Sequence, residues 1–128
     1  MSVALFFITH EGIASNLISI GNAVLQKTDN NLAYHEVPMD ADIDFTIACI
    51  EDDIAQLDTE EGILFITDMY GSTPSNIARQ LADIHHAKLI SGVNLPMVIR
   101  LLNYRENTQN SLVEIALDGA IQGIQHNN

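Results

Sequence analysis

The sequence has no tryptophan and few other aromatic residues, and this shortage limits how its core can be built. Aromatic side chains make up 5% of the 128 residues, whereas apolar residues as a whole make up 47%. The core must therefore consist mainly of Ile, Leu, Val and Ala, a composition that suits a sheet packed under helices. A chain of this length can bury such a core as a single domain over residues 1–128.

Basic residues are also scarce. Five Lys and Arg are set against 17 Asp and Glu, and the formal net charge is −12. Such an acidic surface repels nucleic-acid backbones and anionic lipid, so we expect no nucleic acid as a partner. A basic protein partner would instead be attracted to it.

Cysteines and long apolar runs are almost absent. Cys49 is the single cysteine, so no internal disulfide can form, and we interpret it as a small buried hydrophobe. The N-terminus lacks the basic segment of a signal peptide, and its apolar run ends at Thr9. No apolar run has the length that spans a bilayer. We therefore expect a cytoplasmic protein with no segment inserted in a membrane.

Short apolar runs that alternate with helical patterns predict an α/β fold. The runs at residues 3–9, 32–37, 63–67 and 88–91 are typical of strands, and the first and third are apolar enough to be buried on both faces. Apolar residues at helical spacing lie between them. In the first predicted helix this stripe consists of Ile13, Leu17, Ile20 and Val24. The alternation indicates a mainly parallel sheet flanked by helices.

Capping residues mark where the other helices should begin. Asp42 or Asp44 can cap the second helix, and Thr73 followed by Pro74 is a strong start signal for the third. A fourth helix is expected after Pro96 and continues to about residue 102. After a polar loop at 103–110, Ser111 is expected to cap the last helix.

Polar residues follow three of the predicted strands. The first strand runs into Thr9-His10-Glu11-Gly12, the third into Asp68 and then a Gly-Ser-Thr-Pro turn at 71–74, and the fourth into a Gly-Val-Asn segment at 92–94. The carboxyl ends of parallel strands lie at one edge of a sheet, where ligands of open α/β folds bind. The sequence therefore predicts that these three segments form one site.

His10 is the strongest candidate for chemistry at this edge. A neutral imidazole, with an unperturbed pKa near 6.5, is a good nucleophile when a carboxylate fixes its tautomer. Asp68 is our candidate for that carboxylate. Two alternatives stay open: His10 can be a packed histidine at a strand end, and Asp68 can cap the turn after its strand. Capping is compatible with orienting a histidine, because a carboxylate has two oxygens.

The turn formed by Gly71, Ser72, Thr73 and Pro74 opens a helix, and Gly12 opens an earlier one. Helix N-termini favour anions, and the Thr73 hydroxyl can donate a hydrogen bond to a phosphoryl oxygen. Taken alone, the turn is better explained as a plain N-cap. Together with a histidine and a carboxylate, these residues provide the components of phosphoryl transfer.

The sequence contains no other comparable site. The remaining histidines are His35, His85, His86 and His126, which we interpret as surface or helix-end residues. No metal-ligand spacing, P-loop or GxGxxG motif occurs. We therefore expect no metal and no cofactor.

Three motifs together carry a family resemblance: Thr9-His10, the segment DMYGSTPSN at 68–76, and GVNLPM at 92–97. They resemble the IIA components of the mannose family in the bacterial sugar phosphotransferase system, and the likeness runs through essentially the whole chain. The resemblance implies a doubly wound, flavodoxin-like fold with a four-stranded sheet in the order 2-1-3-4. It also implies a homodimer with an extra antiparallel edge strand exchanged near the C-terminus, for which residues 123–128 are short and polar.

The resemblance further implies a reaction cycle. The phosphohistidine carrier protein HPr donates a phosphoryl group to His10, which passes it to a histidine of a IIB component. Asp68 orients His10, and Thr73 helps to hold the phosphoryl group. The partners are then HPr, IIB and, by docking alone, a membrane permease complex. Ser72 and Glu11 replace glycines that are usual in the family, which bears on the rate of transfer.

Two alternative functions remain. The chain shows no linker and no attached IIB domain, so it can be a transport component or a regulator whose partner binding changes when His10 is phosphorylated. A receiver-like domain phosphorylated on Asp68 would need clustered acids after the first strand to hold Mg²⁺. That position has Thr9 and His10, with Glu11 as the only acid. Sugar specificity is not expected to reside in this chain.

Overall fold

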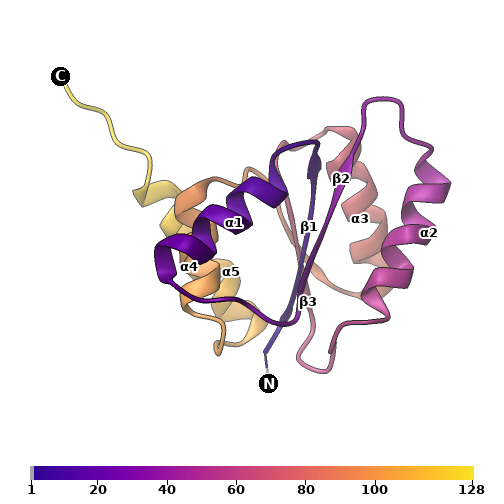
Figure 1. The fold of residues 1–128 in the computed structure, drawn as a ribbon, viewed down its shortest axis with the longest axis horizontal. Helices are drawn as coiled ribbons and strands as arrows, with labels where there is room; N and C mark the ends of the chain where they lie inside the picture. Colours follow the sequence, from indigo (N-terminus) through magenta and orange to yellow (C-terminus); the bar gives the residue numbers. More distant parts are fainter. Residues whose placement is uncertain (1) are drawn as a thin grey trace.

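The computed structural model describes residues 2–128 and has a parallel sheet between two layers of helices (Figure 1). The sheet has four strands in the order β2-β1-β3-β4, and all three pairings are parallel. This confirms the predicted fold class and strand order. In chain order the elements are β1 (Ala4–His10), α1 (Ala14–Leu25), β2 (Leu32–Val37), α2 (Ile43–Ile54), β3 (Ile63–Thr67), α3 (Thr73–His85), β4 (Lys88–Ile90), α4 (Leu95–Asn103) and α5 (Gln109–Gln122).

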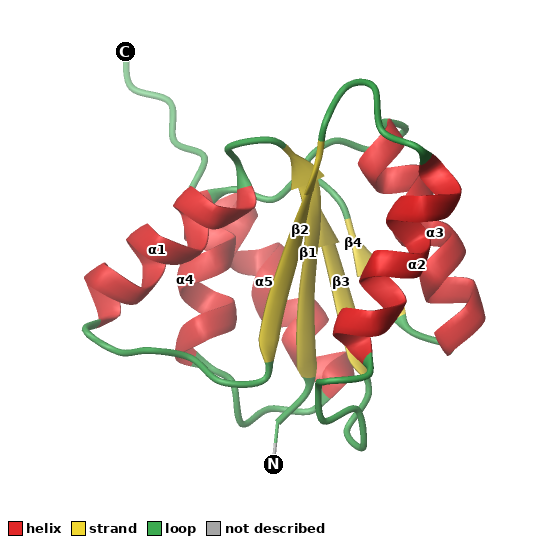
Figure 2. Ribbon diagram, turned by 45° about the vertical axis from the view of Figure 1, so that its right-hand side comes forward, coloured by secondary structure: helices red, strands yellow, loops and turns green. Residues whose placement is uncertain are grey.

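The two central strands form the middle layer of the core. β1 and β3 are buried along almost their whole length, as their continuous apolar runs predict. Alternate side chains point to opposite faces. Leu5 and Phe7 pack with α1, α4 and α5, whereas Phe6 and Phe65 pack with α2 and α3. Figure 2 shows the two helix layers on either side of the sheet.

The sheet edge differs from the expectation at the C-terminus. No antiparallel edge strand is formed: within residues 2–128 the sheet has four strands, and residues 124–128 have no regular structure. This tail extends away from the helices (Figure 1). Its sequence is polar apart from Ile124, so the tail has little apolar surface of its own to bury against the helices.

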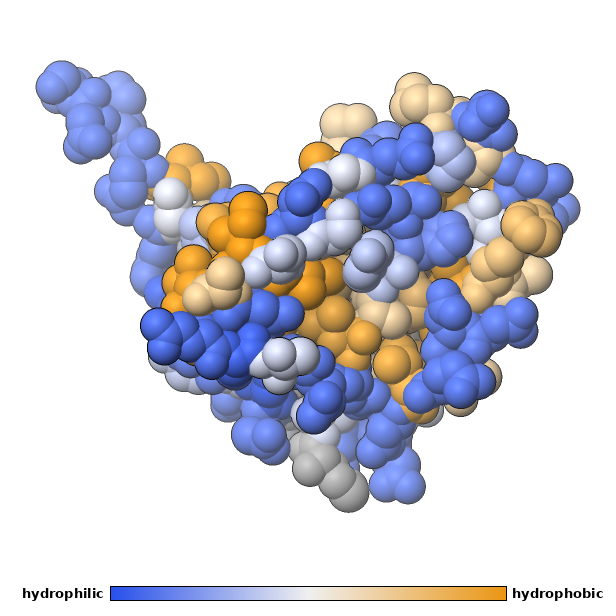
Figure 3. Space-filling model, in the orientation of Figure 1, coloured by the Kyte–Doolittle hydropathy of each residue, from blue (hydrophilic) through white to orange (hydrophobic). Residues whose placement is uncertain are grey.

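The buried face of α1 also differs from the predicted stripe. The helix buries Ala14, Ile18 and Gly21, while Ile20 and Val24 are 45% and 61% exposed. Gly21 explains the rotation, because a Cβ there would lie 2.9 Å from a Leu102 side-chain carbon of α4. Gly21 therefore faces α4. Ile20 and Val24 of the predicted stripe reach the surface, whereas Leu17 packs against the core, and Figure 3 shows apolar surface beside α1.

Two predicted helix caps lie at the wrong residue. Ser72, not Thr73, is the N-cap of α3, because Ser72 has extended backbone angles and Thr73 is already helical. Thr108, not Ser111, caps α5, and its hydroxyl accepts the Ser111 N–H at 3.3 Å. Of the two candidates for α2, Asp42 is the cap and accepts the Phe45 N–H at 3.0 Å.

None of the helices within residues 2–128 is both long enough and apolar enough to cross a lipid bilayer.

Arg105 ties together three segments at the amino ends of the strands. Its side chain is 6% exposed, and Nη1 forms an ion pair with Asp29 at 2.6 Å. Nη1 also donates to the Asn30 carbonyl at 2.9 Å, and Nη2 donates to the Val3 carbonyl at 2.7 Å. The loop after α4 is thereby joined to the start of β1 and to the turn before β2.

We expect Arg105→Met to lower the free energy of unfolding by about 3–5 kcal/mol, because it removes the cation that pairs with the largely buried Asp29 carboxylate and a donor to two carbonyls. Chemical denaturation measures the loss. The matched control is Arg79→Met, since Arg79 makes only an exposed hydrogen bond to Asn76; it should change stability by less than about 1 kcal/mol. Equal losses in the two variants would contradict this role of Arg105.

Candidate functional site

Two of the three predicted strand ends meet directly at the carboxyl edge of the sheet. His10 is the last residue of β1, and Asp68 follows the last residue of the neighbouring β3. The parallel register pairs Ile8 with Thr67, so the next residues of the two strands lie side by side. The third segment, 92–94, is linked to this edge by a hydrogen bond from the Val93 N–H to the Thr67 carbonyl at 3.0 Å.

Asp68 binds both the ring and the backbone of His10. Its Oδ2 lies 2.7 Å from His10 Nδ1 and also accepts the His10 backbone N–H at 3.0 Å. Its Oδ1 accepts the Met69 N–H at 3.0 Å. Asp68 therefore orients the histidine and caps its own turn at the same time. Both oxygens are engaged, which does not suit a carboxylate that receives a phosphoryl group as in a receiver domain.

The contact with Asp68 determines the form of the imidazole. An ionised carboxylate only accepts hydrogen bonds, so the proton of the neutral ring lies on Nδ1. Nε2 then keeps its lone pair. The His10 side chain is 31% exposed, so this nitrogen can be reached by a reactant. Such an arrangement can provide a nucleophile, because a carboxylate beside the ring balances the positive charge that develops on it.

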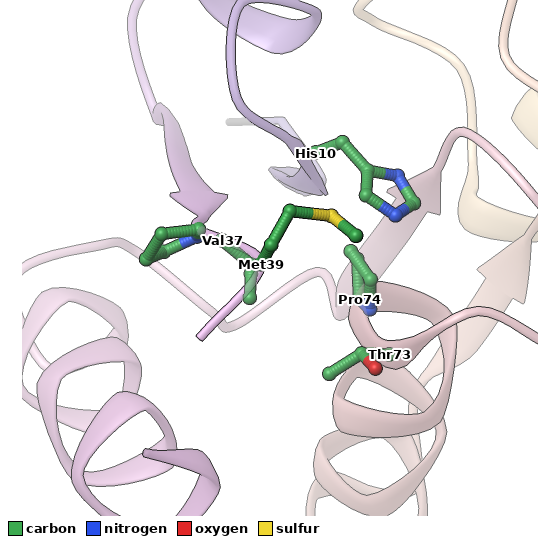
Figure 4. Close-up of a pocket in the computed structure, with 6 residues that line it drawn as sticks. His10, Val37, Met39, Thr73 and Pro74 are labelled. Carbon is green, nitrogen blue, oxygen red and sulfur yellow. The ribbon is translucent and has the colours of Figure 1, made fainter. Parts of the chain in front are cut away.

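A small cavity lies next to His10. It is lined by His10, by Val37, Pro38 and Met39 at the end of β2, and by Thr73 and Pro74 at the start of α3 (Figure 4). Its volume is about 50 Å³, and one water molecule needs roughly 10–15 Å³ by this measure. The cavity therefore admits a group of a few atoms. Met39, 91% exposed, lies at its mouth.

The other predicted phosphoryl-binding residues are placed less directly. Gly71, Ser72 and Gly12 are not among the residues that line this cavity. Gly71 has a φ of +84°, which glycine adopts readily, whereas Ser72 has a φ of −81°. The serine in place of a second glycine is thus unstrained. Its hydroxyl donates to the Met69 carbonyl at 2.6 Å and so belongs to the turn itself.

Glu36 is a residue at this edge that no sequence motif indicates. It lies on β2 opposite Thr9 of β1. Its Oε2 accepts the Ser15 hydroxyl at 2.7 Å and the Ser15 backbone N–H at 2.9 Å. The hydrogen bond from the Ser15 hydroxyl lowers the pKa of Glu36 most; burial opposes the shift, and the backbone N–H groups of Ser15 and Gly12 lower it further. The one signal in the sequence is a single acid in a short strand that is mostly apolar.

Thr9 completes the support of the His10 turn. It is fully buried, its hydroxyl donates to the His10 carbonyl at 2.8 Å, and the same oxygen accepts the Ala14 N–H at 3.1 Å. Hydroxyl groups satisfy helix N-terminal N–H groups in this way. The segment between β1 and α1 is therefore held by Thr9 of β1 itself, by Glu36 of β2 and by Asp68 after β3.

No metal centre is formed at this edge or elsewhere in residues 2–128, where no three His, Cys, Asp or Glu side chains are grouped so that they could hold an ion.

Comparison with known proteins gives consistent matches. A family model described as PTS system fructose IIA component, EIIA-man, matches residues 4–116. The PTS system mannose-specific EIIAB component of Escherichia coli (strain K12) is 30% identical over 128 residues, which cover 98% of this chain and 39% of that protein. The chain thus spans about two fifths of the length of that relative.

Solved structures match in fold. The mannose/sorbose specific IIA subunit from Enterococcus faecalis has a TM-score of 0.87 at 16% identity, over 100% of this chain and 96% of that one. The EIIA component from Streptococcus agalactiae has a TM-score of 0.83 at 19% identity, over 97% and 96%. At such identities these two likenesses concern the fold alone.

The lowered pKa of Glu36 predicts a pH-dependent contribution to stability. A carboxylate with a depressed pKa in the folded state stabilises the protein above its unfolded pKa, and this contribution is lost as the pH falls through the folded pKa. We expect wild type to be more stable than Glu36→Gln at pH 7, with the difference shrinking below about pH 4.3, the ordinary pKa of glutamate. Urea denaturation from pH 7 to pH 3 measures it. A difference independent of pH would show that the charge of Glu36 contributes nothing.

Proposed function

Because the chain belongs to the EIIA-man family of IIA components of the sugar phosphotransferase system, we propose that it is a phosphocarrier that works through His10. His10 accepts a phosphoryl group from phospho-HPr and transfers it to a histidine of a IIB component. The observation that supports this role is the pairing of His10 Nδ1 with Asp68, 2.7 Å apart, beside a cavity of a few atoms' size.

In the first step the Nε2 lone pair attacks the phosphorus of the donor's phosphohistidine. A new N–P bond forms at His10, the donor's N–P bond breaks, and the donor nitrogen leaves with the electron pair. The ring becomes a phosphoimidazolium with its proton still on Nδ1. Asp68 stabilises that positive charge. The second step is the same displacement with His10 as the leaving group, so no proton has to be supplied or removed.

The N-terminus of α3 is suited to receive the charge of the phosphoryl group. Thr73 lies in the first turn of α3 and lines the same cavity as His10. Backbone N–H groups and the helix dipole at such a terminus stabilise anions, and the Thr73 hydroxyl adds a donor. The backbone of Gly71 and Ser72, which leads into this N-terminus, contributes to the same binding of the phosphoryl group. The cycle uses these groups without a metal or a cofactor.

The surface around His10 supports docking of protein partners. Met39, Met69 and Tyr70 are 91%, 59% and 80% exposed beside the turns that carry the site. Large exposed apolar side chains of this kind are typical of interaction surfaces. The net charge of −12 favours a basic partner. HPr and IIB would approach this edge in the cytoplasm, and assembly of the chain as a homodimer belongs to the same proposal.

A regulatory protein switched by phosphorylation of His10 would use the same chemistry. Membership of a family of IIA components favours the phosphocarrier.

The first test is phosphorylation of the purified protein. Incubation with phosphoenolpyruvate, enzyme I and HPr should add one acid-labile phosphate, seen by intact mass, because phosphoramidates hydrolyse in acid. His10→Ala should add none. The matched control is His126→Ala in the exposed tail, which should behave as wild type. An unmodified wild-type protein, under conditions in which HPr is fully charged, would contradict the proposal.

A second test concerns Asp68. In Asp68→Asn the amide can donate to Nδ1, so the ring proton moves to Nε2 and blocks the nucleophile. We expect transfer from phospho-HPr to slow by about 10²-fold or more, and ¹⁵N spectra of the ring to show the changed tautomer. The control is Asp83→Asn. Asp83 is exposed on α3, so this substitution should leave the transfer rate and the ring tautomer unchanged. Wild-type rates in Asp68→Asn would eliminate the orienting role.

A further inference from the structure

Two helices begin at the edge where His10 lies, and their N-termini are not equivalent. α1 starts directly after the His10 turn, and α3 starts at Thr73. Each N-terminus has backbone N–H groups without a partner inside the helix, and such groups attract an anion. At α3 the N-cap Ser72 makes no side-chain cap hydrogen bond. At α1 an anion from the chain itself is already present.

That anion is the carboxylate of Glu36. It accepts the Ser15 N–H and hydroxyl at 2.9 and 2.7 Å, and the backbone N–H of Gly12 also acts on it. Glu36 is ionised at neutral pH, as glutamates ordinarily are, and these hydrogen bonds lower its pKa further. A phosphoryl group could use the α1 terminus only by displacing Glu36 against charge repulsion.

Glu36 also fixes the segment that carries the nucleophile. The His10 carbonyl accepts the Ile13 N–H at 3.4 Å and the Thr9 hydroxyl at 2.8 Å. Glu36 of β2 binds Ser15 in the first turn of α1, directly after this segment, and Asp68, the residue after β3, binds His10. Removing Glu36 therefore frees the start of α1, into which the His10 segment runs, while the contact of the ring with Asp68 remains.

We propose that Glu36 is a positioning residue for phosphoryl transfer: its carboxylate fills the N-terminus of α1, holds the His10 turn in place, and directs the phosphoryl group to the N-terminus of α3. This inference rests on the phosphocarrier function proposed above. Gly12, which the sequence indicated as a phosphoryl ligand, then serves Glu36 instead. Its φ of +85° lets the chain turn so that its N–H faces the carboxylate.

Single-turnover transfer from phospho-HPr tests the proposal. Glu36→Gln and Glu36→Ala should lower the maximal rate by about tenfold to a hundredfold, the range expected when a reacting group is misplaced. The HPr concentration at half-maximal rate should stay within about twofold, because docking residues are untouched. Glu36→Asp, which keeps the charge, should recover part of the rate. The ¹⁵N tautomer signature of His10 should stay that of wild type, which shows that the variants are folded at the site.

Glu11→Gln is the matched control. Glu11 is exposed and lies next to His10 in the chain, so its substitution removes a nearby charge without freeing the turn. The maximal transfer rate of Glu11→Gln should not fall below that of wild type. A rate in Glu36→Ala within about threefold of wild type, or a loss that appears only in the half-maximal concentration, would overturn the positioning role.

A double-mutant cycle with Thr73→Val tests where the phosphoryl group binds. In wild type the loss of one donor at α3 should slow transfer about tenfold or more. In Glu36→Ala the vacated N-terminus of α1 can share the charge of the phosphoryl group, so adding Thr73→Val should slow transfer by a smaller factor than it does in wild type. Independent effects of the two substitutions would overturn the directing role. If wild type itself takes no phosphoryl group, the phosphocarrier function fails, and the role of Glu36 fails with it; transfer in wild type with unaffected variants eliminates only Glu36.

Discussion

The contact between Asp68 and His10 is the interaction on which the site depends. One carboxylate oxygen receives both the backbone and the ring nitrogen of His10, so the position of the residue and the tautomer of its ring are fixed together. This is possible because β1 and β3 are adjacent parallel strands, and Ile8 pairs with Thr67, so that the residues following them lie at the same edge of the sheet. The buried apolar runs of these strands supply the stability that keeps two polar side chains in register above them.

The backbone groups of the helix termini provide the second constraint. Buried or half-buried N–H groups need acceptors, and at this edge the chain supplies them in different ways. Thr9 and Glu36 satisfy the start of α1, and the turn at Gly71 and Ser72 leaves the start of α3 beside the cavity. Backbone N–H groups at the start of α3 offer a local positive potential, even though the formal net charge of the chain is −12.

The fold class and the central pair could be predicted from local patterns, whereas the strand order was implied by the family resemblance. Doubly buried strands give continuous apolar runs, and their order along the chain places His10 and Asp68 at one edge. The buried face of α1 could not be predicted, since it depends on the close approach of Gly21 to α4. Thr108 and Ser111 are both of residue types that cap helices, and the structure shows that Thr108 is the one that caps α5. Glu36 escaped prediction because its contact with Ser15 depends on the register between two strands and the position of a helix.

The central claim is that the phosphoryl group is bonded to His10 through Nε2, while Nδ1 keeps its proton and donates it in a hydrogen bond to Asp68. It is tested most directly by ³¹P and ¹⁵N NMR of the phosphorylated protein with ¹⁵N-labelled histidine. The account predicts a phosphorus coupling to Nε2 of His10 and a protonated Nδ1. A coupling to Nδ1, or an acyl phosphate on Asp68 with His10 unmodified, would contradict it.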